Sequence, residues 1–198
     1  MLAALALSLG LGAGAAHACG DVKHAAASKR SGGARAPLVI GDSVLLGAVR
    51  QVAAAGLEVD TRGCRQMGEG LKLIAKRRRA HTLPGVVVLA LGTNGSIRLR
   101  DIRAALRSIG RERVLGLVTP RELGGGSGAD ARVIRAAGRR FGRRVLVLDW
   151  VRFSRGHGSW FAGDGIHLGA GGAAGMARLL RRARGSDRLG PREQRPNP

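Results

Sequence analysis

Aromatic residues are scarce in this chain of 198 residues, where they make up 3% of the sequence and tyrosine is absent. The hydrophobic core therefore has to be built from alanine, valine, leucine and isoleucine, within an apolar content of 44%. Such side chains suit a parallel sheet that is covered by helices on both faces. A chain of this length forms one domain that buries roughly two thirds of the surface of its unfolded state.

Acidic residues are also few, since 13 Asp and Glu stand against 34 Lys and Arg and the formal net charge is +21. A charge of this sign attracts polyanions, either nucleic acid or the anionic polymers and lipids of a cell envelope. The dense basic cluster Lys76 to Arg79 has no aromatic residues between its charges for stacking on bases. We therefore expect no specific nucleic-acid partner. The alternative interpretation is an arginine-rich composition spread over solvated helix faces.

Long uncharged apolar runs are confined to the N-terminus. Residues 2–16 are such a run, and Ala16-His17-Ala18 follows it. The combination is typical of an export signal with a small-residue cleavage site, and the run is short and glycine-rich for a membrane span. A basic region at its start is missing, which leaves an uncleaved anchor open. We predict a signal peptide or N-terminal anchor over residues 1–18, no integral membrane domain after processing, and a secreted or extracytoplasmic protein.

Cysteine occurs only twice, as Cys19 and Cys64. An oxidising compartment would permit a bridge between them, which would tie the N-terminal arm to the domain. Lipid modification of Cys19, or its removal, remains an alternative on a pair of cysteines alone.

The rest of the chain divides into three parts. Residues 19–36 have no periodic apolar pattern and are predicted to form a flexible arm. Residues 37–184 carry the folded domain, and residues 185–198, rich in Pro, Arg and Gly, are predicted to be a disordered basic tail.

Five short apolar runs alternate with helical patterns inside the domain. The first predicted strand begins at Val39, and the other four cover residues 57–61, 86–91, 114–118 and 145–148. The predicted helices cover residues 44–55, a stretch through 71–74, and residues 99–109, 129–141 and 170–183, with an irregular connection over 151–163. This alternation implies right-handed crossovers and an α/β three-layer sandwich.

One serine directly follows the first strand, where an apolar run ends at Gly41-Asp42-Ser43. Ligands of doubly wound folds lie outside the carboxyl ends of the strands. Ser43 is therefore the candidate nucleophile. The alternative is that Asp42 and Ser43 only cap a helix.

A histidine and a carboxylate follow late in the chain. His167 is the candidate general base, and Asp164, three residues earlier, can reach its other ring nitrogen and fix the tautomer. The rival His157 lies in a glycine-rich loop without a local carboxylate and is interpreted as structural.

An oxyanion needs hydrogen-bond donors. We expect the backbone amides of Ser43 and Gly63 and the side-chain amide of Asn94 to supply them. Gly63 suits this role because a backbone N–H approaches a substrate closely where no side chain intervenes. Gly68 is a weaker rival, and Asn94 in Thr-Asn-Gly could instead be a turn residue.

Four motif blocks in this order resemble the SGNH hydrolases, also called GDSL-like esterases and lipases. The blocks are Gly41-Asp42-Ser43, Gly63, Gly92-Thr93-Asn94 and Asp164 to His167. The resemblance implies a five-stranded parallel flavodoxin-like sheet of order 2-1-3-4-5, a Ser-His-Asp triad, and ester hydrolysis without a metal or cofactor. The blocks also resemble the extracytoplasmic SGNH domains of membrane acyltransferases that acetylate envelope polysaccharides. One departure is Gly95, where many members of the family have Asp.

These observations together predict an exported serine esterase. It would hydrolyse small acyl esters, foremost O-acetyl groups on an envelope carbohydrate, through an acyl-serine intermediate. Its partners would be an acylated carbohydrate or another small ester, with an anionic envelope polymer as a further candidate. The alternatives are an O-acyltransferase of the same fold and a non-catalytic polyanion-binding module. The sequence leaves the acyl group, the alcohol and the oligomeric state open.

Overall fold

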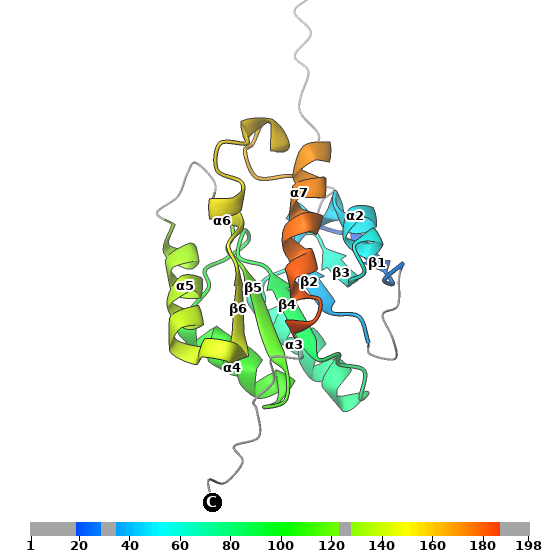
Figure 1. Ribbon diagram of the computed structural model, residues 1–198, viewed down its shortest axis with the longest axis vertical. Coiled ribbons are helices and arrows are strands. Elements are labelled where there is room, and N and C mark those ends of the chain that lie inside the picture. Colours follow the sequence, from blue (N-terminus) through cyan, green and yellow to red (C-terminus); the bar gives the residue numbers. More distant parts are fainter. Residues whose placement is uncertain (1–18, 29–34, 123–127, 187–198) are drawn as a thin grey trace, which may run out of the picture.

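The computed structural model describes residues 19–28, 35–122 and 128–186 (Figure 1). The predicted signal peptide or anchor lies outside these residues, as does all but the start of the predicted tail. Within the described ranges, none of the helices has the length and apolar character needed to cross a membrane.

A mostly parallel sheet forms the centre of the domain. Its strands are β1 (Val22–Ala25), β2 (Leu38–Gly41), β3 (Glu58–Arg62), β4 (Val86–Ala90), β5 (Val114–Val118) and β6 (Val145–Leu148). They lie in the order β1-β3-β2-β4-β5-β6, and every neighbouring pair from β3 to β6 is parallel. The five parallel strands therefore have the predicted order 2-1-3-4-5, which confirms the fold class.

The sixth strand comes from the segment that was predicted to be a flexible arm. β1 pairs antiparallel with β3, from Val22 opposite Arg62 to Ala25 opposite Val59. Cys19 and Cys64 form a disulfide whose Cα atoms are 4.8 Å apart, so the arm is also tied down covalently. The prediction was wrong for residues 22–25 because their side chains are largely exposed and carry no apolar pattern. The free edge of β3 and the disulfide hold them instead.

Helices cover both faces of the sheet. The α-helices are α1 (Ser43–Leu46), α2 (Val49–Ala54), α3 (Met67–Arg79), α4 (Leu99–Ile109), α5 (Ala129–Phe141), α6 (Trp150–Phe153) and α7 (Ala170–Leu180). The described residues also form the short 3-10 helices η2 (Gly142–Arg144), η3 (Gly158–Trp160) and η4 (Arg181–Ala183). α1, α2, α6 and α7 pack on one face, and α3, α4 and α5 pack on the other (Figure 1).

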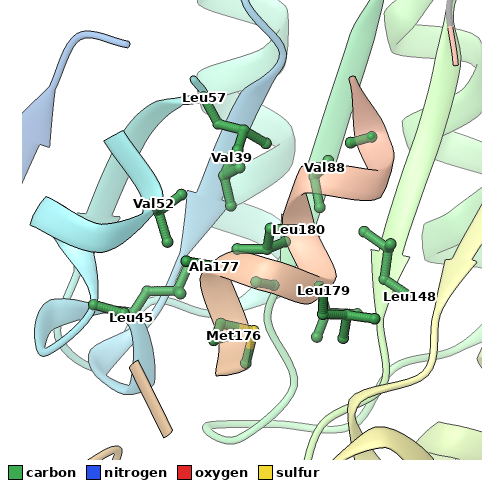
Figure 2. Close-up of a cluster of buried hydrophobic side chains, with 14 of the residues drawn as sticks. Val39, Leu45, Val52, Leu57, Val88, Leu148, Met176, Ala177, Leu179 and Leu180 are labelled. Atoms are coloured by element: carbon green, nitrogen blue, oxygen red, sulfur yellow. The ribbon is translucent and has the colours of Figure 1, made fainter. Parts of the chain in front are cut away.

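The pleat of the buried strands divides the core between the two faces. Val39 and Val88 point toward α2 and α7, where Figure 2 shows them beside Val52 and Leu180. Leu38, Ile40, Val87 and Leu89 point to the opposite face and meet Ile74, Ile102 and Ile134. All five residues of β4 are buried, as expected for a central parallel strand.

The helix predicted over residues 44–55 is interrupted at Gly47, which caps α1. A Cβ atom at Gly47 would lie 3.3 Å from the carbonyl oxygen of Leu168, so the glycine allows the loop after His167 to approach α1. The connection predicted to be irregular over residues 151–163 contains most of α6, which begins at Trp150, and all of η3.

Candidate active site

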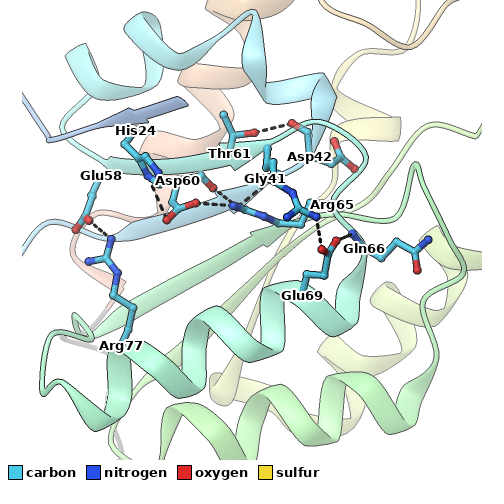
Figure 3. A network of polar contacts seen from close by, with 11 residues as sticks. His24, Gly41, Asp42, Glu58, Asp60, Thr61, Arg65, Gln66, Glu69 and Arg77 are labelled. Carbon is cyan, nitrogen blue, oxygen red and sulfur yellow. Dashed lines mark hydrogen bonds and ion pairs between the residues drawn. The ribbon is translucent and has the colours of Figure 1, made fainter. Parts of the chain in front are cut away.

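Ser43 lies at the start of α1, immediately beyond the carboxyl end of β2. Asp42 is the N-cap of this helix, and its carboxylate accepts a hydrogen bond from the Val44 N–H at 3.1 Å. The Thr61 hydroxyl donates to the Asp42 carbonyl oxygen at 2.6 Å, which fixes the turn against β3 (Figure 3). A Cβ atom at Gly41 would be 2.4 Å from Leu45, so only glycine lets the helix fold back so sharply.

Burial dominates the chemistry of Asp42. The side chain is buried, and desolvation raises the pKa of its carboxyl to about 6, although hydrogen bonds from Val44 and Thr93 act in the opposite direction. The group therefore keeps its proton to a higher pH than an exposed aspartate does.

His167 is next to Ser43 although 124 positions separate them in the sequence. The Ser43 Oγ lies 3.1 Å from the His167 Nε2. The His167 Nδ1 lies 2.5 Å from the Asp164 Oδ2. A proton on Nδ1 that is donated to Asp164 leaves Nε2 as the acceptor for the Ser43 hydroxyl. The structure thus brings these three predicted residues into one chain of hydrogen bonds.

Asp164 also organises its own loop. Its Oδ1 accepts hydrogen bonds from the backbone amides of Ile166 at 2.9 Å and His167 at 3.0 Å. The hydrogen bond from the His167 side chain, together with these amides, lowers the pKa of the Asp164 carboxyl to about 2. Asp164 is therefore a carboxylate at neutral pH.

Arg121 anchors this loop from the end of β5, a role that the sequence did not predict. Its Nε donates to the Gly165 carbonyl oxygen at 2.9 Å, and its guanidinium lies 4.1 Å from the centre of the Phe161 ring. Glu122 accepts hydrogen bonds from the amides at the start of α5 rather than pairing with Arg121. A sequence pattern places both residues after a strand but does not show what their side chains reach.

Trp160 packs the same loop onto α7. The Gly169 N–H donates to the Trp160 carbonyl oxygen at 2.9 Å, and the Ala162 N–H donates to the His167 carbonyl oxygen at 2.8 Å. The rival His157 stacks on Trp160, with the ring centres 3.9 Å apart, and therefore has a packing role. These contacts hold His167 over Ser43.

The three expected oxyanion donors differ in availability. Ser43 is the first residue of α1, so its N–H has no acceptor within the helix. The Asn94 Nδ2 is buried and has no hydrogen-bond partner among the described residues. The Gly63 N–H, in contrast, donates to the Asp21 carbonyl oxygen at 2.9 Å, which conflicts with the role predicted for it. The rival Gly68 lies inside α3.

A small cavity of about 20 Å³ borders the turn that carries Ser43. Asp42, Thr93, Arg121, Trp150 and Ile166 are among the residues that line it. Within the described part of the chain, no group of three or more His, Cys, Asp or Glu side chains is arranged to hold a metal ion.

Comparisons with known proteins agree with this architecture. No model of a protein family matches the sequence. O-acetyltransferase OatA of Staphylococcus aureus (strain NCTC 8325 / PS 47) is 30% identical over 149 residues, which are 73% of this chain and 24% of that protein. The chain thus spans about a quarter of the length of the curated relatives it matches.

Solved structures share the fold. The C-terminal catalytic domain of Streptococcus pneumoniae peptidoglycan O-acetyltransferase A superposes with a TM-score of 0.69 at 23% identity, over 81% of this chain and 98% of that domain. A family 3 carbohydrate esterase of Talaromyces cellulolyticus gives 0.55 at 15% identity, over 74% and 95%. Motif blocks, strand order and sequence similarity agree, and the chain has the fold of the SGNH hydrolases and resembles the SGNH domains of envelope O-acetyltransferases.

Proposed function

We propose that the protein is an exported serine esterase that removes small acyl groups, foremost O-acetyl, from a cell-envelope carbohydrate. The observation that carries this proposal is the chain of hydrogen bonds from Ser43 through His167 to Asp164. Similarity to O-acetyltransferases and to a carbohydrate esterase supports an acyl-modifying enzyme. Transfer of the acyl group to a sugar hydroxyl is the alternative within the same chemistry.

The proposed reaction begins with Ser43. Its Oγ attacks the ester carbonyl while the His167 Nε2 takes the hydroxyl proton, and Asp164 stabilises the imidazolium. Collapse of the tetrahedral intermediate breaks the bond to the alcohol oxygen, which receives the proton from His167. Water then attacks the acyl-Ser43 with the same base, releasing the acid and restoring the serine. In the transfer alternative, a sugar hydroxyl takes the place of water.

Asn94 supports this scheme through its unpaired donor. A buried amide without a partner costs about 1–3 kcal/mol. The negative oxygen of the tetrahedral intermediate would supply the missing acceptor at the step where it lowers the barrier. Loss of one such donor typically reduces kcat about 10²- to 10³-fold.

Similarity to O-acetyltransferases supports acetyl as the acyl group. The Streptococcus pneumoniae relative is a peptidoglycan O-acetyltransferase, which supports an envelope polymer as the carrier of the ester and an extracytoplasmic location.

The test is product analysis with an O-acetylated glycan and an acetyl-free acceptor glycan. We expect release of acetate and a loss of activity of at least about 10³-fold in Ser43→Ala. Acetylated acceptor in place of acetate would select the transferase alternative. Unchanged turnover in Ser43→Ala would eliminate both forms of the proposal.

A second candidate, a non-catalytic module for anionic envelope polymers, is favoured by one groove. This groove of about 680 Å³ lies at the C-terminal end of α4, and five arginines and a single glutamate line it: Arg78, Arg103, Arg107, Arg111, Arg144 and Glu112. Such a surface binds polyanions in a salt-sensitive manner, independently of Ser43. This candidate leaves the hydrogen-bonded Ser43, His167 and Asp164 without a role, so we place it second.

A further inference from the structure

The loop after β3 offers a backbone donor other than the one that the motif suggests. β2 and β3 run parallel with Gly41 paired to Thr61, so the residues after Arg62 lie beside Asp42 and Ser43. Gly63 is the first of these, but its N–H already donates to the Asp21 carbonyl oxygen of the N-terminal arm. The N–H of the next residue, Cys64, has no acceptor among the residues that the structure describes.

Cys64 has an unusual backbone conformation. Its φ is +55°, and only one other described non-glycine residue has a positive φ. L-amino acids other than glycine disfavour this left-handed region, so the surrounding structure has to impose it. The disulfide to Cys19 imposes it from one side, because Cys19 is itself held beside β3 through the pairing of β1.

Arg65 fixes the loop from the other side. Its buried guanidinium donates to the Gly41 carbonyl oxygen at 3.2 Å, the Asp60 carbonyl oxygen at 2.6 Å and the Asp60 carboxylate at 2.7 Å (Figure 3). The Arg65 N–H also closes a turn onto Arg62. Cys64 is therefore clamped between the end of β2, two residues before Ser43, and the disulfide-bonded arm.

We propose that the backbone N–H of Cys64, and not that of Gly63, is the second main-chain donor to the oxyanion, and that the Cys19–Cys64 disulfide is its positioning device. This inference rests on the proposed function. It makes the turnover of the ester dependent on the oxidised state of the two cysteines. Reduction by a dithiol frees Cys64 to leave the left-handed region, and the donor then turns away from the reacting carbonyl.

Two double variants separate the conformation of residue 64 from the crosslink itself. Cys19→Ala/Cys64→Gly lacks the disulfide but adopts a positive φ freely, whereas Cys19→Ala/Cys64→Ala lacks it and does not. With p-nitrophenyl acetate, we expect the alanine form to lose about tenfold in kcat with little change in KM, because the left-handed conformation is lost. We expect the glycine form, which keeps the backbone N–H and can adopt a positive φ, to retain more activity than the alanine form.

Dithiothreitol gives a second measurement, in which the wild-type protein is assayed before and after reduction of its disulfide. Wild-type activity should fall on reduction and return on reoxidation, whereas the glycine form should be insensitive to the reagent. Equal losses in the glycine and alanine forms, or wild-type activity that resists complete reduction, would overturn the inference. An inactive wild-type enzyme would instead refute the proposed function, so the two failures are distinguishable.

Discussion

Two aspartates of one site have opposite electrostatic environments. Burial raises the pKa of Asp42 to about 6, whereas the hydrogen bond from His167 lowers the pKa of Asp164 to about 2. An unfolded chain titrates both near the ordinary value of about 3.9. Asp164 therefore contributes stability that is present above about pH 4 and is lost as the pH falls toward 2. The contribution of Asp42 to stability has the opposite pH dependence, because it is present below about pH 4 and is lost as the pH rises toward 6.

The pH dependence of stability should reveal Asp42. Between about pH 4 and 6 the unfolded chain loses this proton while the folded protein keeps it, so stability falls by up to about 3 kcal/mol. Asp42→Asn removes the titration and should remove that fall. Urea unfolding of both proteins at pH 4 and pH 7 measures it. Parallel changes in the two proteins would contradict the role given to burial.

At the residue level, the sequence predicted those site residues whose partners are local or lie at strand ends. Ser43 follows a strand, and Asp164 and His167 are three positions apart, so their pairing could be foreseen. Gly63 could not be judged in this way, because the acceptor of its N–H is Asp21, in a segment without any periodic pattern. Arg121 was missed for a similar reason, since its partner Gly165 is distant in sequence.

At the level of secondary-structure elements, the packing of α7 against the segment around Trp160 requires glycine at two positions of the helix. A Cβ atom at Gly172 would lie 2.2 Å from the Trp160 carbonyl oxygen, and one at Gly175 would lie 2.5 Å from the Trp160 ring. These glycines let the helix approach the loop that presents His167. The helix therefore packs against the loop that carries His167 as well as against the core.

Gly172→Ala should disturb both stability and activity. Overpacking against the Trp160 backbone should cost about 1–3 kcal/mol of unfolding free energy and displace His167. Gly68→Ala is the matched control, because its Cβ meets no atom within 4 Å, and it should gain about 0.4–1 kcal/mol with unchanged activity. Thermal unfolding and ester hydrolysis measure both. A Gly172→Ala protein as stable and active as the control would refute the packing argument.

The boundaries of helices and strands were predicted correctly where the spacing of apolar residues is regular. The helices α4 and α5 begin and end where the spacing of apolar residues predicted. The predicted helix over residues 44–55 is divided at Gly47 by a contact with Leu168, which no local pattern could reveal. β1 was missed because edge pairing and a disulfide, and not side-chain burial, hold it.

On the scale of the whole molecule, the parallel sheet brings distant segments to one edge. Ser43 follows β2, Cys64 follows β3, Asn94 follows β4 and Arg121 follows β5, while His167 comes from the loop before α7. This convergence follows from strand order, because carboxyl ends of parallel strands share one edge. The helix α4 follows β4 in the chain, so its N-terminal end comes after this edge of the sheet. The arginine-lined groove lies at the other, C-terminal end of α4.

The most direct measurement is labelling of the full chain with a fluorophosphonate, followed by mass-spectrometric mapping of the adduct. An activated serine predicts one adduct per chain, on Ser43, with parallel loss of ester hydrolysis. Labelling should be absent in Ser43→Ala and strongly slowed in His167→Ala. A chain that stays unlabelled while it still binds anionic polymers, or that carries its adduct on another residue, would contradict a catalytic Ser43.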